Sequence, residues 1–565
     1  MNDIRRTILW VIFGFSLVLI WDKWQLHNGK QATFFPGPAP AVTASEPAAP
    51  GAGASAVPVS SAAVPAAAPA PVAAPAVPAE APVVPRERVE VSTDVLRLTF
   101  DSEGGSLTHA ELRQHADLVD GSKKFMLLDD SSQRVYVAQT GLIGGSFPTH
   151  KTGMTVVPGA RELKDGENEL SVRFESPDLG GVKLVKTWTA KRGAYDIAVK
   201  HEVINTGTAP VAPKLYLQLV RDGNKPPGES SFYSTFTGPA VFTQEKKYQK
   251  VDFKEIEENK ADFAKESSTG YVAMVQHYFA TAWLLPEGTP REIFMRKVDA
   301  NLYSVGMITA LDSIAPGASK VLDARLFAGP QVETVLETLS PGLELVKDYG
   351  WLTILSKPLY WLLDQLHKIL GNWGWAIVAL VLLLKIAFYW LNAKAYASMA
   401  KMKAVNPKIM EMRERLKDKP QQMQQEMMRI YREEKVNPMG GCFPIMIQIP
   451  VFIALYWVLL SSVEMRNAPW IGWVHDLSAP DPFFILPVLM TLSTLLQTAL
   501  NPAPPDPMQA KMMWIMPLMF SVMFFFFPAG LVLYWLTNNI LSIAQQWIIN
   551  TRMGVPPQFN LPKFK

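Results

Sequence analysis

One lysine lies in the middle of a long apolar stretch. Lys385 interrupts the run AIVALVLLLKIAFYWL, and Lys394 follows it nine residues later, just beyond the end of that run. In an uninterrupted helix this spacing corresponds to about 13 Å, which would place the lysine close to the middle of a bilayer. A lysine at that depth costs roughly 2.5–3.5 kcal/mol on insertion scales. Either the side chain snorkels to the interface, or it faces a wet cavity in which it attracts an anionic ligand.

Uncharged polar side chains accompany Lys385 on the other apolar segments of the chain. They are Gln448, Gln497, Thr537, Asn538, Asn539, Ser542, Gln545 and Gln546. For any one of them, an ordinary hydrogen bond between neighbouring helices is the simpler explanation. Taken together with Lys385, they predict a helical bundle that is polar in its cytoplasmic half and apolar in its outer half. Such a bundle would suit a groove that opens to the cytoplasm and is closed to the outside.

No acidic residue lies within the apolar segments that are expected to cross a membrane. Proton and ion relays in membranes usually rely on carboxylates, so the sequence disfavours a proton-coupled transporter. Lys385 likewise has no acidic partner within these segments. We therefore expect its anionic partner to arrive with a substrate.

A basic, methionine-rich segment follows the one that contains Lys385. Residues 394–438 are dominated by helix-forming residues, and Lys417-Asp418-Lys419-Pro420 supplies a turn, so we predict a helical hairpin. Methionine suits surfaces that accommodate varied apolar partners; the alternative is that the hairpin packs on itself. The basic residues either hold the segment in the cytoplasm or bind anionic lipid. The candidate contacts of the hairpin with partners are Met399, Met402, Met423 and Met427.

The patterns of common catalytic and metal sites do not occur in this sequence. Its histidines are scattered, and it contains no HExxH, Gly-x-Ser-x-Gly or GxxxxGK[ST] pattern. A single cysteine excludes a disulfide framework and a cysteine-rich metal site. We therefore expect a protein that is not an enzyme, needs no metal or other cofactor and hydrolyses no ATP. The net charge of +3 does not argue for nucleic acid as a specific ligand.

Membrane-spanning helices are the elements that would position these side chains. The chain is 48% hydrophobic, and the apolar residues concentrate in a few long runs, which excludes a wholly soluble protein. Thr7–Trp21 follows two arginines and is interpreted as an uncleaved anchor; a cleaved signal peptide is the alternative. The other five candidate spans are Gly374–Leu391, Phe443–Val463, Phe483–Leu500, Met512–Phe527 and Leu531–Ile549.

The distribution of basic residues agrees with six spans. Residues 394–435 and the tail after Asn550 are rich in lysine and arginine, whereas the loop 464–482 contains only Arg466. Cytoplasmic loops carry such an excess of positive charge. Both termini and the basic segment are therefore expected in the cytoplasm, and residues 22–373 on the outer side.

The region between the first and second spans divides into three parts. Residues 25–85 are rich in proline and alanine, which predicts an extended spacer. Residues 86–348 show period-two alternation, as in Leu96–Phe100 and Leu215–Leu219, with Gly-Gly pairs at the turns, and predict an antiparallel β-sandwich closed by a short helical patch, Gln331–Tyr349. Residues 349–371 are apolar on one side and predict a helix in the membrane interface, broken early by Pro358.

The expected fold class is thus an α-helical polytopic membrane protein with six transmembrane helices, five of which form a core, plus an all-β domain. The expected division of the chain is an anchor (1–24), a linker (25–85), an outer β-domain (86–348), an interfacial helix (349–371), a five-span core (372–550) with the hairpin 394–438 inside it, and a basic tail (551–565).

Five strings in the second half of the chain resemble the YidC/Oxa/Alb family of membrane protein insertases, in its long Gram-negative form. They are GNWGWAIVAL (371–380), SMAKM (398–402), EKVNPMGGCFPIMIQIPVFIALY (434–456), WVHDLSAPDP (473–482) and FPAGLVLYW (527–535). Each string alone is a weak signal, but their order and spacing are specific. The resemblance covers roughly residues 350–550, and the anchor, linker and β-domain match the longer architecture.

The resemblance implies a hydrophilic groove among five core helices and a β-supersandwich similar to sugar mutarotases. The groove arginine of the family falls on Lys385, which keeps the charge but loses the planar, bidentate guanidinium, so a strict requirement for charge here stays open. A groove threonine of the family falls on Val381, and Gln448 and Asn538 complete the expected groove. Positions that contact the substrate helix fall on Ile449, Phe452 and Trp535, the last in place of a tyrosine.

The function implied by the resemblance is insertion and folding of proteins in the bacterial inner membrane, alone or with the Sec translocon. The implied partners are nascent membrane proteins, the Sec translocon and the phospholipid bilayer, with the ribosome and the signal recognition pathway as candidates at the hairpin and tail. Two alternatives stay open at this point: a small-solute secondary transporter and a tethered, sugar-modifying outer enzyme.

Overall fold

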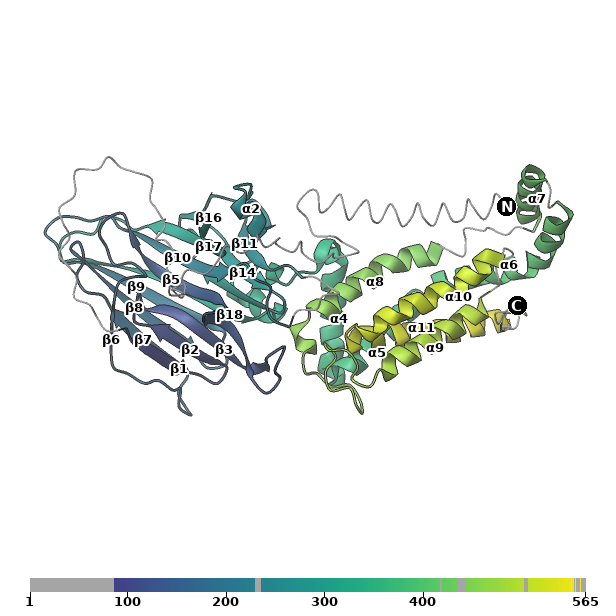
Figure 1. Cartoon of the computed structure of the whole chain (residues 1–565), viewed down its shortest axis with the longest axis horizontal. Helices are drawn as coiled ribbons and strands as arrows, with labels where there is room; N and C mark the ends of the chain where they lie inside the picture. The colour runs from purple at the N-terminus through teal and green to yellow at the C-terminus, as the bar shows by residue number, and fades with distance from the viewer. Residues whose placement is uncertain are drawn as a thin grey trace, which may run out of the picture. The chain divides into compact units, whose positions relative to one another are not determined.

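The computed structural model describes residues 86–228, 235–416, 419–434, 443–501 and 507–552, together with Gly554 and Phe559. The expected anchor and linker, residues 1–85, and most of the expected basic tail lie outside them. The described residues form two compact units, with the boundary between Lys347 and Asp348. The strands belong to the first unit and the long helices to the second (Figure 1).

The first unit is a sandwich of two nine-stranded antiparallel sheets, which confirms the prediction from the period-two alternation. One sheet has the order β1 (Arg88–Ser92), β2 (Leu96–Asp101), β3 (Ser106–Ala116), β4 (Lys124–Asp130), β5 (Val135–Ile143), β10 (Lys214–Asp222), β17 (Leu302–Ala310), β16 (Arg291–Asp299) and β13 (Glu266–Ser267). The other has the order β12 (Lys247–Lys250), β11 (Gly238–Thr243), β14 (Tyr271–Gln276), β15 (Phe279–Leu284), β18 (Ser319–Pro330), β9 (Asp196–Asn205), β8 (Val182–Lys191), β7 (Glu169–Glu175) and β6 (Thr155–Val156).

Burial follows the alternation only in strands that expose one face. In β2, Leu96 and Leu98 are buried and Arg97 between them is exposed, as the sequence predicted. The central strand β10 is different, because both of its faces are buried. Tyr216, on the face opposite the predicted apolar positions, belongs to a second apolar cluster with residues of the neighbouring strands β5 and β17. Alternation in the sequence of β10 therefore did not identify an exposed face.

Three short helices complete the first unit. They are α2 (Phe253–Glu257), α3 (Glu333–Leu339) and the 3₁₀ helix η1 (Leu343–Val346). The last two lie within the predicted helical patch, and Leu336, Leu343 and Val346 are fully buried against the second sheet. These apolar contacts close that end of the core.

The ammonium group of Lys186 is fully buried in the sandwich. Lys186 on β8 donates from Nζ to the carbonyl oxygens of Gly104 (2.6 Å) and Thr140 (2.7 Å). His201 Nε2 lies 3.0 Å from the hydroxyl of Thr140. Burial lowers the pKa of Lys186 to about 7, and burial together with the charge of Lys186 lowers the pKa of His201 to about 3.

We expect the stability of the sandwich to rise with pH between about 7 and 10.5 because of Lys186. In this window the lysine of the unfolded chain holds a proton that the folded unit has lost, so raising the pH favours folding. The contribution is at most about 1.4 kcal/mol per pH unit, and it should be absent from Lys186→Met. Thermal unfolding of residues 86–347 at a series of pH values measures it. Identical pH dependence in the wild type and Lys186→Met would contradict the expectation.

The second unit is a bundle of helices with α11 at its centre. Its elements are η2 (Gly350–Leu352), α4 (Thr353–Leu370), α5 (Trp373–Ala387), α6 (Tyr389–Arg415), α7 (Pro420–Glu433), α8 (Phe443–Ser461), η4 (Val463–Met465), α9 (Ile485–Leu500), α10 (Pro507–Ser521), η5 (Val522–Phe525) and α11 (Ala529–Arg552). Helix α11 contacts α5, α6, α8 and α9, and α9 also contacts α10. In Figure 1, α8, α9, α10 and α11 lie side by side.

Among the described residues, no single helix combines the length and the hydropathy needed to cross a bilayer. The requirement is met only by α5 and the first part of α6 taken together, and these are bent by 65° with respect to each other. The predicted span Gly374–Leu391 is therefore not one straight helix. The distance of about 13 Å from Lys385 to Lys394 assumed a continuous helix, and it is wrong for this bent pair.

The bend lies at Phe388, without a proline or glycine to mark it. The amide of Phe388 ends α5 by donating to Leu384, and its carbonyl accepts the first hydrogen bond of α6, from Asn392. After the bend, the side chain of Asn392 reaches Gln545 on α11 (3.4 Å). A hydrogen bond between helices, invisible in the local sequence, thus accompanies the change of direction.

The helix predicted at residues 349–371 is present as α4, but Pro358 does not break it. Proline removes one backbone hydrogen bond from a helix interior. Here Ser356, Tyr360 and Leu363, on the two sides of the proline, are buried in the bundle. Burial of this face offsets the lost hydrogen bond, so α4 continues to Leu370.

Candidate functional site

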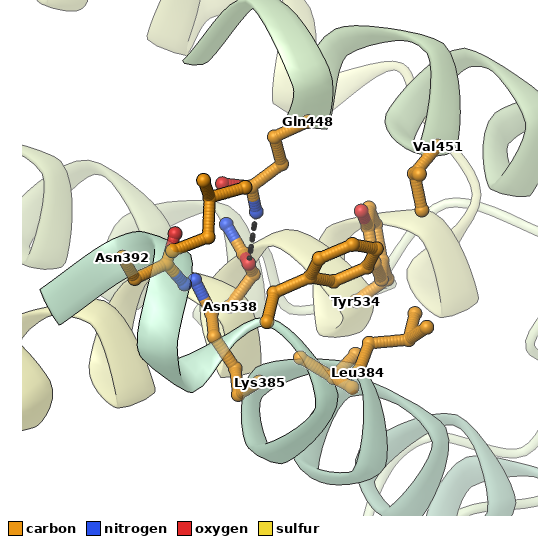
Figure 2. Close-up of a pocket in the computed structure, with 10 residues that line it drawn as sticks. Leu384, Lys385, Asn392, Gln448, Val451, Tyr534 and Asn538 are labelled. Carbon is orange, nitrogen blue, oxygen red and sulfur yellow. Dashed lines mark hydrogen bonds between the residues drawn. The ribbon is translucent and has the colours of Figure 1, made fainter. Parts of the chain in front are cut away.

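A pocket with mixed polar and apolar walls lies between α5, α6, α8 and α11 (Figure 2). The space between its lining atoms amounts to about 440 Å³ and includes open solvent. The structure brings together the four predicted groove residues here. The lining residues are Val381, Leu384, Lys385, Phe388, Leu391, Asn392, Gln448, Val451, Tyr534 and Asn538.

Lys385 supplies the positive charge of the pocket. It lies in the last turn of α5, and only 9% of its surface is exposed. Its Nζ donates to Ser542 Oγ on α11 at 2.7 Å. Among the described residues that line the pocket, none carries a carboxylate. The ammonium is therefore held by a neutral oxygen, which leaves its charge available to an anion.

Two further polar pairs cross the pocket. Gln448 Nε2 on α8 donates to Asn538 Oδ1 on α11 at 3.0 Å, as Figure 2 shows. Asn392 Nδ2 on α6 donates to Gln545 Oε1 on α11 at 3.4 Å. Val381, where a threonine would add a hydroxyl, is buried and contributes apolar surface. The polar wall of the pocket therefore consists mainly of amides.

Sequence reasoning missed Asn392 and Tyr534 as pocket residues. Asn392 stands beyond the end of the apolar run, and its approach to Lys385 depends on the bend at Phe388. Tyr534 lies within the string FPAGLVLYW, directly before Trp535, the predicted contact of the substrate helix. Successive helical residues point in directions about 100° apart, so Tyr534 lines the pocket whereas Trp535 contacts Phe452. The polar residue next to an aromatic run was the available signal for Asn392.

The three residues predicted to contact a substrate helix lie beside an aromatic cluster. The ring of Phe452 stacks on that of Trp535 at a centroid distance of 5.0 Å, and Phe524 and Phe527 lie 4.6 and 5.7 Å from the same tryptophan. Ile449, one turn before Phe452 on α8, is 48% exposed. The structure therefore places an apolar, partly exposed surface next to the polar pocket.

The methionines predicted to contact partners have a different environment. Met423 and Met427 on α7 pack against Val405, Ile409 and Met412 on α6. This is the self-packed arrangement that the sequence left as an alternative. The side chains of Met399 and Met402 are outside the described part of the chain, whereas Met410 and Met428 are exposed on the hairpin.

The loop 466–481 fixes the starts of α5 and α11, two of the four helices that line the pocket. Asn372 caps α5 by accepting from the amide of Trp375, and its Nδ2 donates to the carbonyl oxygens of Pro469 and Trp470. Gly374 packs so closely on Trp470 that an added Cβ would lie 2.2 Å from the indole. At the start of α11, the amides of Ala529 and Gly530 donate to the carbonyls of Ala479 and Leu477. This loop therefore sets the positions of α5 and α11.

The arrangement of this site suits binding. It offers one cation, several amides and an adjacent aromatic surface, which together match a peptide that is polar at one end and apolar at the other. Within the described residues, no group of three or more His, Cys, Asp or Glu side chains could hold a metal ion.

Two family models match this chain. The model described as "YidC periplasmic domain" matches residues 88–362, and the one described as "60Kd inner membrane protein" matches residues 365–555. The chain is 55% identical to the membrane protein insertase YidC of Cupriavidus taiwanensis and 56% identical to that of Ralstonia nicotianae. Each alignment covers 98% of this chain and 98% of the relative.

Among solved structures, a YidC insertase crystal structure with the first transmembrane domain resolved is 20% identical, with a TM-score of 0.37. That comparison covers 82% of this chain and 92% of the solved one. A galactose mutarotase-like protein from Lactobacillus casei is 9% identical, with a TM-score of 0.30, and covers 43% of this chain and 100% of its own. Both TM-scores are low, so neither solved structure superposes closely on this chain.

Proposed function

This chain belongs to the YidC family of membrane protein insertases, and from that premise we propose that it inserts nascent membrane proteins into the bacterial inner membrane and assists their folding. The observation that carries the proposal is identity above 50% to named insertases along 98% of the chain. The pocket between α5, α6, α8 and α11 supports it, because it pairs a cation and amides with an apolar surface. The family assignment does not favour the alternative of a small-solute transporter.

The proposed topology has six spans, with both termini in the cytoplasm and the β-sandwich in the periplasm. The domain limits are those expected from the sequence: an anchor (1–24), a linker (25–85), the β-domain (86–348), an interfacial helix (349–371), a five-span core (372–550) and a basic tail (551–565). The excess of lysine and arginine in residues 394–435 supports this orientation.

The proposed mechanism lowers the barrier for a short polar segment of the substrate. Such a segment loses several kcal/mol when its polar groups enter hydrocarbon unpaired. In the pocket, Lys385, Gln448 and Asn538 replace water as its partners, and the cation attracts acidic side chains in particular. Because the substrate's groups exchange one set of hydrogen bonds for another, the cost of leaving water falls.

The apolar helix of the substrate follows a second path. Ile449, Phe452 and Trp535 form a partly exposed surface along which this helix slides into lipid. Transfer of about 20 apolar residues into the bilayer supplies the driving force. These steps need no covalent chemistry, cofactor or nucleotide. In the proposed role, the protein is therefore not an enzyme.

The proposed partners follow from this role. They are nascent membrane proteins, the phospholipid bilayer and the Sec translocon, with the ribosome and the signal recognition pathway at the hairpin and the tail. On the hairpin, exposed Met410 and Met428 supply apolar contact points on a basic surface.

Reconstitution tests the proposed function. We expect liposomes that contain the purified chain to insert a single-span protein with a short polar N-terminal tail, so that the tail becomes protected from protease. Liposomes without the chain are the control. Equal protection in the two preparations would contradict the proposal.

In the same assay, a variant that lacks residues 36–320 should retain most of the activity. The pocket and the aromatic surface lie entirely in the second unit, and the deletion removes only the linker and most of the sandwich. Correct incorporation of the variant is checked by labelling of its cytoplasmic hairpin. A properly incorporated but inactive variant would assign an essential role to the β-domain.

A further inference from the structure

Ser542 joins two helices of the bundle, α5 and α11, through one hydroxyl group. This buried serine on α11 accepts a hydrogen bond from Lys385 Nζ on α5 at 2.7 Å. Within its own helix, Ser542 donates to the carbonyl oxygen of Asn538 at 2.6 Å. The hydroxyl therefore lies where α5 and α11 meet.

The numbers of hydrogen-bond donors and acceptors on the Ser542 hydroxyl make it a suitable partner for the lysine. A serine hydroxyl has one proton to donate and two lone pairs to accept. Because the proton of Ser542 is committed to Asn538, both lone pairs face outward from α11. The lysine ammonium can only donate, so the oriented lone pairs of Ser542 are a matched acceptor for it.

A lysine needs such an acceptor more than an arginine does. The ammonium sits at the end of a flexible four-carbon stem, whereas a guanidinium is a rigid fork with five donors. A lysine near the end of an apolar helix can also snorkel toward water. Among the described residues, Ser542 is the one hydrogen-bond acceptor of Lys385. Without it, nothing described in the pocket keeps the ammonium at its inner wall.

We propose that Ser542 is a positioning residue that holds the Lys385 ammonium inside the pocket and thereby sets its preference for acidic polar segments of the substrate. The inference rests on the proposed insertase function. Ser542 itself does not contact the substrate. It fixes the place of the charge that does.

The test compares two substrates that differ only in charge. One single-span protein carries two aspartates in its polar tail, and the other carries two asparagines at the same positions. We expect Ser542→Ala to reduce insertion of the acidic substrate by about tenfold, since one hydrogen bond to a charged group is lost. Insertion of the asparagine substrate should fall much less, and Ser542→Thr, which restores the hydroxyl, should recover the acidic preference.

Thr551→Ala is the matched control. Thr551 is an exposed hydroxyl on the same helix and makes the same bond to the carbonyl four residues earlier, Trp547 (2.9 Å), but it is away from the pocket. We expect this variant to insert both substrates like the wild type. Equal loss of both substrates in Ser542→Ala would indicate a merely structural role and would overturn the inference.

A double variant separates positioning from other effects. In a Lys385→Met background no ammonium is left to position, so Ser542→Ala should cause no further loss of acidic preference. A further loss of the same size as in the wild type would overturn the inference. If the wild-type chain inserts neither substrate, the proposed function fails and the inference falls with it; if the wild type inserts both, only the inference is being tested.

Discussion

Insertion of a substrate with an acidic polar segment should fall by about a hundredfold in Lys385→Glu, because an attraction is replaced by repulsion between buried charges. Insertion of an otherwise identical uncharged substrate should fall much less. Among the lining residues that the structure describes, Lys385 alone is charged. A glutamate there would face an acidic segment across the same space. The reconstituted assay with paired substrates measures the ratio of the two rates.

Two control variants show whether a change in the ratio of the two insertion rates is due to the charge at position 385. Lys385→Arg keeps the charge and should retain the preference for acidic segments. Lys511→Glu, an equal change of charge at an exposed position on α10, should leave both substrates unaffected. Equal insertion of acidic and uncharged substrates by Lys385→Glu would show that the cation does not select for charge.

Gly374→Ala should destabilise the helical unit by roughly 3 kcal/mol. The added Cβ would lie 2.2 Å from Cδ1, 2.4 Å from Cγ and 2.6 Å from Cβ of Trp470. These atoms belong to the stem of a large side chain and cannot move aside cheaply. Either the loop 466–481 or the start of α5 has to shift. Thermal unfolding of the full chain in detergent, followed by tryptophan fluorescence, should show a lower Tm.

A second substitution separates this clash from a general effect of alanine. Trp470→Ala removes the obstructing ring, so the two changes together should destabilise less than the sum of the single changes. Gly121→Ala, where no atom lies within 4 Å of the added Cβ, should leave Tm unchanged. Strict additivity of Gly374→Ala and Trp470→Ala would contradict the proposed clash.

The sequence was most informative where structure follows from a local pattern. Alternation in strands such as β2 predicted the sandwich, because one face of each such strand meets the core. Pattern alone failed for β10, whose second face is buried by side chains from neighbouring strands. It failed again at Pro358, where tertiary burial of α4 outweighs a lost hydrogen bond.

In the candidate site, too, some residues could be predicted from the local sequence and others depend on tertiary contacts. Lys385 and the amides Gln448 and Asn538 stand out in the sequence because polar groups are rare in apolar segments. The bend at Phe388 carries no such signal, and it is this bend that brings Asn392 to the pocket. Nor does the sequence reveal which hydroxyl meets Lys385, since that depends on the rotation of α11 against α5.

The spacing of the polar residues on α11 has a consequence for how the pocket opens. Asn538, Ser542 and Gln545 recur on one face of the helix, and their partners lie on three different helices, α8, α5 and α6. A modest rotation of α11 about its own axis would loosen all of these bonds together. The three bonds would then be lost in one step and not one after another. A substrate would thus meet three polar contacts that are either all formed or all broken.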